Sequence, residues 1–587
     1  MEDTCYTLDG TMDLGGRPVL ASTTGKWKAC YFILVYRGLE RFAYYGVAAN
    51  LVNYMTTQLN KDLTSSISNI NNWSGSAWIS SFLGAYMADS FMGSFWTITL
   101  SLIIYAIGFV LLALTTSLKS LRPTCKNGIC NKASNLQLKL FYLSLYTIMI
   151  GSGAVKPNMS AFGADQFDDF NPKDKKLKVS FFNWWSFNNS FGTLVATLLV
   201  VYIQERFGWG LGYGLSAIGF LLSFLIFFLG TPIYRHKARK TRSITLDFIR
   251  VMVVAFRNRK LQLPNSPSEL HEFELHHYIN SGSGQIYHTP HFRFLDKAAI
   301  KESKVDVSNP ICTVTQVEGT KLVVRMSQIW LLMLIPSNFW AVEVTIFIKQ
   351  GTTMERSLGP NYHIPAASLW SIVVITMLIS LPIYDHYFIP FMRQRTRNIR
   401  GITLLQRVGV GIAIQIIAIA ITCAVEMHRM HVIRMQHVVG PEEIVPMSIF
   451  WLLPQHVLLG ISDTFLVTGL HEFFYDQSPK EMKCLGTTFY TSIVAAGNFF
   501  NSFLVTMIDS LTRKMGSESW IGNNLNDCHL EYYYGFLSVI SIINFGVFLW
   551  VSSGYIYKRE NTIEVSDMEI EKPRRKTSKS ELLVVKT

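Results

Sequence analysis

The sequence predicts an all-α membrane protein whose twelve transmembrane helices form two six-helix halves. Of its 587 residues, 49% are hydrophobic and only 16% are charged, whereas an ordinary soluble domain carries about 25% charged residues. A soluble chain of this length would fold into several domains with polar surfaces, and these charged residues are too few to cover them. The composition therefore argues against a soluble enzyme, a disordered protein and a disulfide-rich scaffold.

Twelve segments are long and apolar enough to cross a bilayer as helices, which takes about 20 residues each. Several contain Gly or Pro, which helices in a bilayer tolerate. No long stretch alternates apolar and polar residues, so a membrane β-barrel is not predicted. The predicted spans are 29–54, 72–91, 95–117, 138–163, 180–204, 211–232, 327–350, 366–391, 402–426, 446–476, 486–509 and 531–557.

A polar segment separates the first six spans from the last six. The halves on either side of it, 1–232 and 326–558, are nearly equal in length. Equal halves around a long central loop are typical of pseudo-symmetric transporters. The predicted organisation is an N-terminal tail (1–28), an N-terminal bundle (29–232), a central loop with amphipathic helices (233–326), a C-terminal bundle (327–557) and a basic C-terminal tail (558–587).

The distribution of Lys and Arg predicts that both termini are cytoplasmic. With the termini inside, the inner segments hold 36 of the 53 Lys and Arg residues, and the outer loops hold 13. Inner loops of membrane proteins carry such an excess, so the net charge of +13 requires no nucleic-acid partner. The outer loop at 118–139 runs against the trend with five basic residues. The same loop contains Cys125 and Cys130, which could form one bridge or stay as two free thiols.

The predicted cytoplasmic segments carry features of their own. The N-terminal tail shows no signal peptide, and the plasma membrane and the vacuolar membrane both suit the sequence. The stretch 247–260 combines an apolar face with a basic end, which predicts an amphipathic helix on the inner membrane surface. The basic stretch 572–580 either stays solvated near anionic lipid or offers a kinase site at Thr577 or Ser578.

Ionisable residues inside the spans are the most informative, because each costs roughly 2.5–3.5 kcal/mol at the bilayer centre. Arg37, Glu40 and Arg41 lie at i, i+3 and i+4 in the first span, so they share one helix face. Tyr44 and Tyr45 extend that face by a turn. We expect the group to line the interior of the bundle, either as part of a transport site or as a structural ion-pair cluster.

Three more ionisable residues lie in later spans. Lys156 precedes Pro157 in the fourth span, Glu343 stands in an apolar run of the seventh, and Glu472 lies in the tenth. Lys156 could instead extend to the inner headgroups, and Glu343 could be the internal partner of an Arg or Lys. Since both halves direct charge to the middle, we predict a water-filled site between them. Its cations could hold a carboxylate or an inorganic anion, and its carboxylates could hold an amine or carry a proton.

Motifs for several other functions are missing from the chain. It contains no GxxxxGKS/T loop for a nucleotide, no HExxH and no GxSxG. Its 14 His residues show no metal-ligand spacing. We therefore predict no enzyme activity, no cofactor and no bound metal.

Nine stretches of the chain resemble motifs of one known family. They are ERFAYYG (40–46), NNWSGSAW (71–78), GAYMADSFMG (84–93), KPNMSAFGADQFD (156–168), FFNWW (181–185), HTPHFRFLDKAAI (288–300), CTVTQVEGTK (312–321), GITLLQRVGVG (401–411) and EFFYDQSPKEM (472–482). In this order they are similar to the plant nitrate/peptide transporter family (NPF), part of the proton-dependent oligopeptide transporters and of the major facilitator superfamily. The opening stretch, YTLDGTMDLGGRPVLASTTGKWKAC, resembles the fifth, peptide-transporter-like subfamily.

This resemblance implies a major facilitator fold that works by alternating access around a central substrate site. At the matching positions, it implies that Arg41 and Lys156 engage a substrate carboxylate. It also implies that Tyr45 lines the pocket and that Glu472 meets a substrate amine. Glu343 falls in the region of the seventh helix where relatives place a protonatable carboxylate.

The chain departs from the pattern of this family at two positions. The first-helix motif usually reads Glu-x-x-Glu-Arg, but here Arg37 replaces the first Glu, which places proton coupling in question. The loop after the second span usually carries an Arg where this chain has Ser94. The nitrate branch uses a His in the seventh helix, and 327–350 contains no His.

Four functions are compatible with these observations. The leading prediction is proton-coupled symport of small peptides or similar small zwitterionic or anionic solutes, with Glu40, Glu343 or Glu472 carrying the proton. The first alternative, suggested by Arg37, is a weakly proton-coupled transporter of nitrate or an organic anion. A non-transporting sensor or scaffold and a membrane enzyme are the remaining alternatives.

Overall fold

The computed structural model describes residues 6–7, 10–126, 129–168, 171–237, 244–264, 266–274, 285–300, 312–396, 401–438, 440, 443–478, 483–514 and 519–557. The chain divides into two compact units, which we call the helical unit and the linker unit. The helical unit comprises Met1–Ser243, Arg325–Gln477 and Lys483–Tyr555, and the linker unit comprises Ile244–Val324, Ser478–Met482 and Ile556–Thr587.

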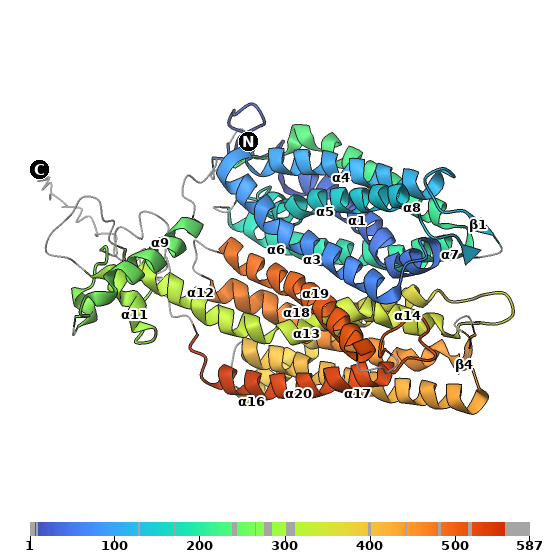
Figure 1. Ribbon diagram of the computed structural model, residues 1–587. Coiled ribbons are helices and arrows are strands. Elements are labelled where there is room, and N and C mark those ends of the chain that lie inside the picture. The colour runs from blue at the N-terminus through green and yellow to red at the C-terminus, as the bar shows by residue number, and fades with distance from the viewer. Residues whose placement is uncertain are drawn as a thin grey trace, which may run out of the picture. The chain divides into compact units, whose positions relative to one another are not determined.

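The first half of the helical unit is built from six long helices (Figure 1). Helix α1 packs against α6 and α8, α4 packs against α5 and α8, and α3 packs against α5. The Asp62 side chain caps α3, and a capping box of Ser134 and Gln137 starts α5, as expected for these residue types. The elements are α1 (Lys26–Ala48), α2 (Leu51–Asn53), η1 (Tyr54–Gln58), α3 (Leu63–Met87), η2 (Ala88–Met92), α4 (Ser94–Ser117), α5 (Asn135–Ala164), α6 (Pro172–Val195), η3 (Ala196–Val200), α7 (Val201–Arg206), α8 (Trp209–Leu229) and η4 (Thr231–Ile233).

The second half repeats the pattern of six spans. Helix α17 packs against α18 and α20, α15 packs against α18, and α13 packs against α19, while α3 joins the two halves through α19. Its elements are α12 (Val314–Leu332), α13 (Leu334–Glu343), α14 (Ile346–Thr352), η8 (Ala366–Leu369), α15 (Trp370–Ile383), η9 (Tyr384–Phe388), α16 (Ile389–Thr396), α17 (Leu404–Gln436), η10 (Ile449–Leu452), α18 (Leu453–Gln477), α19 (Lys483–Lys514) and α20 (Leu530–Ser553).

Nine helices among the described residues are long and apolar enough to cross a membrane. The seventh span makes a tenth, bent by 48° between Val314–Leu332 and Leu334–Thr352. Helices α1 and α3 complete the first half, although ionisable residues of α1 and the Ser and Asn residues of α3 lower their apolar character. Each of the twelve predicted spans falls on one of these helices.

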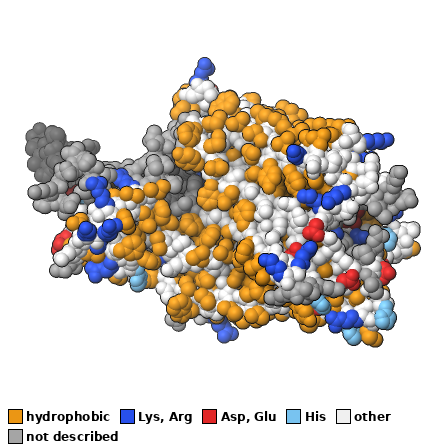
Figure 2. All heavy atoms as spheres, viewed as in Figure 1, with side chains coloured by type: hydrophobic (Ala, Val, Ile, Leu, Met, Phe, Trp, Pro, Cys, Tyr) orange, Lys and Arg blue, Asp and Glu red, His pale blue; other side chains and the backbone are white. Residues whose placement is uncertain are grey.

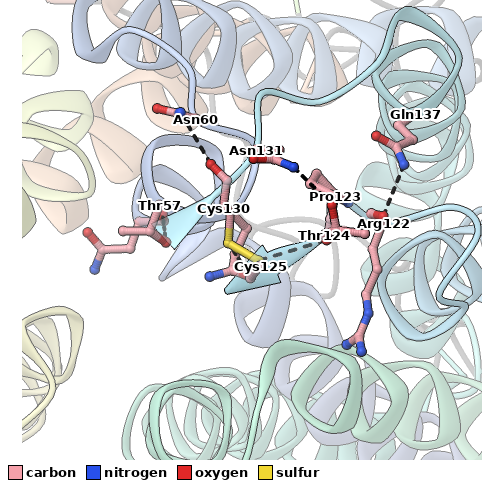
Figure 3. Close-up of a disulfide and its surroundings, with 11 residues drawn as sticks. Thr57, Asn60, Arg122, Pro123, Thr124, Cys125, Cys130, Asn131 and Gln137 are labelled. Carbon is pink, nitrogen blue, oxygen red and sulfur yellow. Dashed lines mark hydrogen bonds between the residues drawn. A yellow bond between two sulfur atoms is a disulfide. The ribbon is translucent and has the colours of Figure 1, made fainter. Parts of the chain in front are cut away.

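Short strands and a disulfide lie at the end of the helical unit where α4 meets α5. Cys125 and Cys130 are bonded, which decides between the two possibilities left by the sequence. Figure 3 shows that the Asn60 side chain donates to the backbone carbonyl of Cys130, at 3.3 Å, and so ties this loop to the connection between α1 and α3. The strands of the described chain are β1 (Cys125–Lys126), β2 (Ile129–Cys130), β3 (Met354–Glu355) and β4 (Val445–Ser448), paired β1 with β2 and β3 with β4.

Hydrophobic side chains cover the outward faces of the long helices. Figure 2 shows them as a broad apolar surface, with charged side chains gathered near the end that carries β1 and β4. Leu211 and Ile218 of α8 and Ile543 and Trp550 of α20 are more than half exposed. On helices long and apolar enough to cross a membrane, such faces are typical of surfaces that contact lipid.

A buried arginine anchors the N-terminal tail to the opposite end of the first half. Arg235 is fully buried and donates to the backbone carbonyls of Thr24, at 2.7 Å, and Ala21, at 3.0 Å. Gln166, in the turn after α5, accepts from the Arg235 amide at 2.8 Å. Gly25 has φ 67°, and a Cβ there would lie 2.3 Å from Arg235 Nε, so only glycine fits this close approach.

The linker unit has a small core of its own. Helix α9 (Ile244–Arg257) packs against α11 (Arg293–Asp296) and η7 (Lys297–Ala299), with η5 (Asn258–Lys260) and η6 (Pro267–Glu269) between them in sequence. Val251 and Leu295 are buried in this core, whereas Val253 and Phe256 on another face of α9 are exposed. Thr577 and Ser578, the predicted kinase sites, lie outside the described residues.

Candidate functional site

Three ionisable residues of α1 form one compact group, as the first span predicts. Arg41 donates through Nε and Nη2 to the two carboxylate oxygens of Glu40, each at 2.6 Å. Arg37 Nη1 donates to Glu40 Oε2 at 3.2 Å, and the Tyr105 hydroxyl of α4 donates to Oε1 at 3.2 Å. Glu40 and Arg41 are 1% and 2% exposed. A single buried carboxylate therefore serves two guanidinium groups.

Arg37 of α1, the residue that departs from the family motif, is held in place by side chains of α6. Arg37 Nη2 donates to the side-chain oxygen of Asn189 at 2.7 Å, and its guanidinium lies 4.6 Å from the ring centre of Trp185. Amide and aromatic partners hold a guanidinium without neutralising it. Arg37 is thus fixed in place while it still contributes positive charge.

Lys156 of α5 is a cation held between aromatic rings. Its Nζ is buried and lies 4.2 Å from the ring centre of Trp78 and 5.0 Å from that of Tyr44. No acceptor within the described part of the chain takes a hydrogen bond from this ammonium. Cation–π contacts of this kind are worth about 0.5–2 kcal/mol, less than full hydration, so the group is prepared to bind an anion.

Tyr45 lies where the two halves meet. Its ring centre is 5.0 Å from that of Trp370, the first residue of α15 in the second half. The Arg41 guanidinium lies 5.7 Å from the same Tyr45 ring. Tyr45 therefore connects the α1 cluster with the second half.

The second half contributes two buried acidic residues close to that contact. Glu343 ends α13, and its Oε2 accepts from Trp370 Nε1 at 3.2 Å. Asp463 of α18 accepts from Trp340 Nε1 at 3.0 Å. Glu343 Oε1 is buried and accepts no hydrogen bond from the described residues. Sequence reasoning missed Asp463, although an acidic residue inside the tenth predicted span was the signal that identified Glu472.

The Glu472 carboxylate forms an ion pair with Arg407, which belongs to the same half. Arg407 of α17 donates to Glu472 Oε2 at 3.2 Å and to the Thr468 hydroxyl at 2.6 Å. The Arg407 guanidinium also lies 4.2 Å from the ring centre of Tyr384. The Glu472 side chain is 39% exposed, so it is more accessible than Glu343. It lies nine residues beyond Asp463 on the same helix, which is about 14 Å along the axis.

The other departure from the family pattern lies away from these groups. Ser94 is the first residue of α4, and Gly93 before it has φ 77°. A glycine takes this conformation without strain, so the turn between η2 and α4 is set by Gly93. Ser94, at the first position of α4, is half-buried.

The two halves are joined at the end that carries the disulfide loop. Arg356, after α14, forms an ion pair with Glu205 of α7 at 3.1 Å. Lys349 of α14 donates to the Thr56 hydroxyl of η1 at 3.1 Å. Three further hydrogen bonds join the halves at this end. The Leu63 amide donates to the Asn523 side chain, the Thr64 hydroxyl donates to the carbonyl of Ile521, and the Ser368 hydroxyl donates to the carbonyl of Thr197. These contacts close the helical unit at this end.

Three potential metal ligands meet in the linker unit, at His288, Asp296 and Glu318. The Lys321 ammonium lies 2.7 Å from Asp296 Oδ1 and 2.7 Å from Glu318 Oε1. The Thr289 amide and hydroxyl both donate to Glu318. A protein cation thus already neutralises the carboxylates, and we interpret the group as an ion-pair network within the linker unit.

Comparison with known proteins agrees with this fold and arrangement. The model of the POT family (PTR2) matches residues 95–521. The Arabidopsis thaliana protein NRT1/PTR FAMILY 5.1 is 59% identical over 556 residues, with 95% of each chain covered. NRT1/PTR FAMILY 5.2 of the same plant is 44% identical over 573 residues, covering 96% of this chain and 98% of the relative.

Solved structures show the same fold at lower identity. An auto-inhibited POT family peptide transporter is 18% identical, has a TM-score of 0.66 and covers 91% of this chain and 98% of its own. The POT family transporter PepTSo is 19% identical, with a TM-score of 0.66 and coverages of 90% and 99%. A POT family transporter in complex with 5-aminolevulinic acid is 16% identical, with a TM-score of 0.61 and coverages of 89% and 96%.

These comparisons confirm the predicted all-α major facilitator fold and the resemblance drawn from the motifs. They make the protein a multi-pass membrane transporter and not an enzyme. The chain belongs to the POT family, as a member of subfamily 5 of the plant NRT1/PTR transporters.

Proposed function

We propose that this transporter carries small peptides, or similar small zwitterionic or anionic solutes, together with protons by alternating access. The observation that supports this most is the distribution of unpaired charge. The first half offers Lys156, an ammonium with no acceptor among the described residues. The second half offers Glu343 and Asp463, which form no ion pair within the described chain. A solute with a carboxylate at one end and an amine at the other matches this polarity.

Each predicted site residue has a role in this proposal. Lys156 binds the substrate carboxylate directly. In this structure two hydrogen bonds hold the Arg41 guanidinium against Glu40. A proton on Glu40 would weaken this ion pair, and Arg41 would then also bind the substrate carboxylate. Tyr45 lines the site, and Glu472 receives the substrate amine in exchange for Arg407. The 5-aminolevulinic acid bound by one structural neighbour is a small molecule with an amine and a carboxylate, which agrees with a zwitterionic substrate.

The transport cycle that we propose is a rocking of 29–232 against 327–557. The contacts at the disulfide end, such as Arg356 with Glu205, would be broken when the site opens to that side. With both termini cytoplasmic, the disulfide end would face the outside or the vacuolar lumen, and the contacts between the halves at that end would close the site on that side. Protonation of Glu40, Glu343 or Glu472 would favour the reorientation.

The orientation can be tested through the disulfide. In intact cells, a membrane-impermeant maleimide is expected to label Cys125 and Cys130 only after external reduction. Among the other described cysteines, Cys30, Cys312 and Cys528 are buried and Cys423 is partly exposed. A variant in which Cys125 and Cys130 are both changed to Ser therefore measures the background labelling of the remaining cysteines. Labelling from the cytoplasmic side alone, in inside-out vesicles, would reverse the proposed topology.

Uptake into expressing oocytes under voltage clamp tests the function itself. A labelled dipeptide and labelled nitrate are compared side by side at acidic and at neutral external pH. We expect acid-stimulated dipeptide flux with inward current. Nitrate flux with little pH dependence would instead establish the second candidate, and the absence of flux for every solute despite ligand binding would indicate a sensor.

The second candidate, a weakly proton-coupled transporter of nitrate or an organic anion, rests on Arg37. This residue shares Glu40 with Arg41. Together with Lys156, the candidate site residues of the first half are therefore three cations and one carboxylate. Arg37→Glu is expected to increase the ratio of uptake at acidic pH to uptake at neutral pH, because it restores a second protonatable group beside Arg41. The matched control is Arg37→Gln, which removes the cation without adding a carboxyl. An equal ratio in both variants would show that the Arg37 position has no part in proton coupling.

A further inference from the structure

We propose that helix α9 of the linker unit binds anionic phospholipids of the cytoplasmic leaflet, through an exposed apolar stripe and a cluster of cations at its end. The sequence predicts an amphipathic helix at 247–260, and the structure adds the residues that select the class of lipid. The inference rests on the predicted cytoplasmic side of the linker. It does not depend on which solute the protein transports.

Helix α9 has two apolar faces, and only one of them is buried. Val251 and Ala255 are 1% and 5% exposed and lie in the core of the linker unit. The side chains of the other face recur at i, i+3, i+4 and i+7, which is one stripe along a helix, and they are 39–68% exposed. This α9 stripe consists of Ile249, Met252, Val253 and Phe256. A continuous apolar surface of this kind is typical of a site that binds a partner or a membrane.

Three cations lie at the C-terminal end of the α9 stripe. This α9 basic cluster consists of Arg257, Arg259 and Lys260, all of which are exposed. The Arg259 guanidinium lies 4.5 Å from the ring centre of Phe256, so a cation–π contact joins the cluster to the stripe. The Asn258 side chain donates to the carbonyl of Lys297 at 2.9 Å. This bond fixes η5, which carries Arg259 and Lys260, to η7.

The acidic residues of the linker unit leave the α9 basic cluster available to an anion. Asp296 and Glu318 both pair with Lys321. Glu272 accepts from the amide and the hydroxyl of Thr315, at 2.8 and 2.9 Å. Among the described residues, no ion pair includes a cation of the cluster. A ligand of the cluster should therefore carry negative charge.

The stripe and the cluster line one open hollow. Its volume is about 470 Å³, and it is lined by Val253, Phe256, Arg257, Arg259 and Lys260. Sites for small ligands measure about 300–1,000 Å³. Figure 2 shows Lys and Arg side chains beside hydrophobic ones on the linker unit. An apolar surface next to cations suits a molecule whose anionic headgroup is joined to hydrocarbon, which is the chemistry of an acidic phospholipid.

The course of the chain keeps α9 near the membrane. Helix η4 ends at Ile233, after the sixth span, and α9 begins at Ile244. The intervening residues, 234–243, extend over about 35 Å at most. The cytoplasmic leaflet carries acidic phospholipids, and Lys and Arg residues beside a membrane helix are attracted to them. Acidic phospholipid is therefore the anionic partner that α9 meets at the highest local concentration.

Spin labelling of the full-length protein in nanodiscs tests this proposal. A label at Val253→Cys is compared in phosphatidylcholine alone and in phosphatidylcholine mixed with phosphatidylserine. In the anionic nanodiscs we expect the label to collide with oxygen, which concentrates in hydrocarbon, and to be shielded from a water-soluble nickel chelate. In neutral nanodiscs the chelate should reach it. A label at Gln262→Cys, an exposed position of the same unit, should meet the chelate in both, and the protein without an introduced cysteine gives the background.

Substitutions of the cations test their part in lipid binding. Each Lys or Arg near an acidic lipid surface contributes about fivefold in affinity. Combining Arg257→Gln, Arg259→Gln and Lys260→Gln should therefore lower the ratio of inserted to exposed Val253→Cys label by about a hundredfold. The matched control is Arg293→Gln, which removes an exposed cation of α11 outside the hollow. It should change the ratio by less than about twofold.

Several results would overturn the proposal. Equal insertion in neutral and anionic nanodiscs would exclude selection of acidic lipid, and insertion caused by inorganic phosphate in neutral nanodiscs would show that a free anion is enough. A label shielded from both oxygen and the chelate would mean that protein covers the stripe, and a label exposed in both nanodiscs would mean that water does. If the triple variant does not fold, salt replaces it. The Debye length falls from about 10 Å at 0.1 M to about 3 Å at 1 M, so undiminished insertion at high salt would count against the cations.

Discussion

Lys156→Gln is expected to lower uptake at sub-saturating substrate concentration by about tenfold to a hundredfold. The reason is that a hydrogen bond to a charged group contributes about 1.5–3 kcal/mol, and about 1.4 kcal/mol corresponds to a factor of ten. In the absence of substrate, the Lys156 ammonium has aromatic neighbours and no acceptor among the described residues. We therefore expect an anionic group of the substrate to be its principal partner. Initial uptake rates over a range of concentrations measure the effect.

Lys139 provides the matched control for this substitution. It lies on α5 as well, but it is exposed near the opposite end of that helix. Lys139→Gln removes the same charge from the same helix and should leave uptake within about twofold of the wild type, because exposed surface charges contribute little. Equal uptake by Lys156→Gln and the wild type would remove Lys156 from the binding site. Surface expression of both variants has to match for the comparison to count.

Glu426→Ala is expected to destabilise the folded protein by about 3–5 kcal/mol, since it leaves a buried charge without its partner. Arg429 Nη2 and Nε donate to the two oxygens of Glu426 at 2.6 and 2.9 Å, and both side chains are 0% exposed. Gln350 also donates to Glu426, at 2.6 Å. The cluster joins α14 and α17, so its loss should abolish the monodisperse peak in size-exclusion chromatography of detergent extracts.

The ion pair of Asp509 and Arg513 serves as an exposed control for the buried Glu426 pair. Both residues also lie on one helix, with Arg513 Nε 2.8 Å from Asp509 Oδ1, but the Arg513 side chain is 59% exposed. Asp509→Ala should therefore cost less than about 1 kcal/mol and shift the thermal unfolding midpoint far less than Glu426→Ala. Similar midpoints for the two variants would mean that the Glu426 cluster is hydrated in the membrane protein.

The sequence predicted the spans well where apolar runs end at clear signals. The third predicted span, 95–117, matches α4 (Ser94–Ser117) because Gly93 breaks the helix before it. The helix that contains the seventh predicted span begins before the span itself, since α12 starts at Val314. Its first turns contain Glu318 and Lys321, which satisfy each other and Asp296 within the linker unit. Composition does not reveal that such charges belong to a continuous helix.

The sequence predicted the candidate site as a set of residues but not as a set of pairs. Buried charges in apolar spans identified Arg37, Glu40, Arg41, Lys156, Glu343 and Glu472. Their partners depend on tertiary packing, because Glu472 pairs with Arg407, 65 positions away, and Asp463 bonds to Trp340, 123 positions away. The Arg41–Glu40 contact joins neighbours in the chain, yet its two-bond geometry depends on rotamers that periodicity does not report.

The α1 cluster also has a consequence for how the chain is made. On insertion scales each charged residue opposes entry of a helix into the membrane by about 2.5–3.5 kcal/mol, and α1 emerges first from the ribosome. The Tyr105 hydroxyl that supports Glu40 follows 65 residues later, and the Asn189 oxygen that supports Arg37 follows 152 residues after it. At about 5–20 residues per second, the second interval lasts about 8–30 s. During that time we expect α1 to be sheltered by the translocon or an insertion chaperone, because the α1 cluster is completed only when Asn189 of α6 arrives.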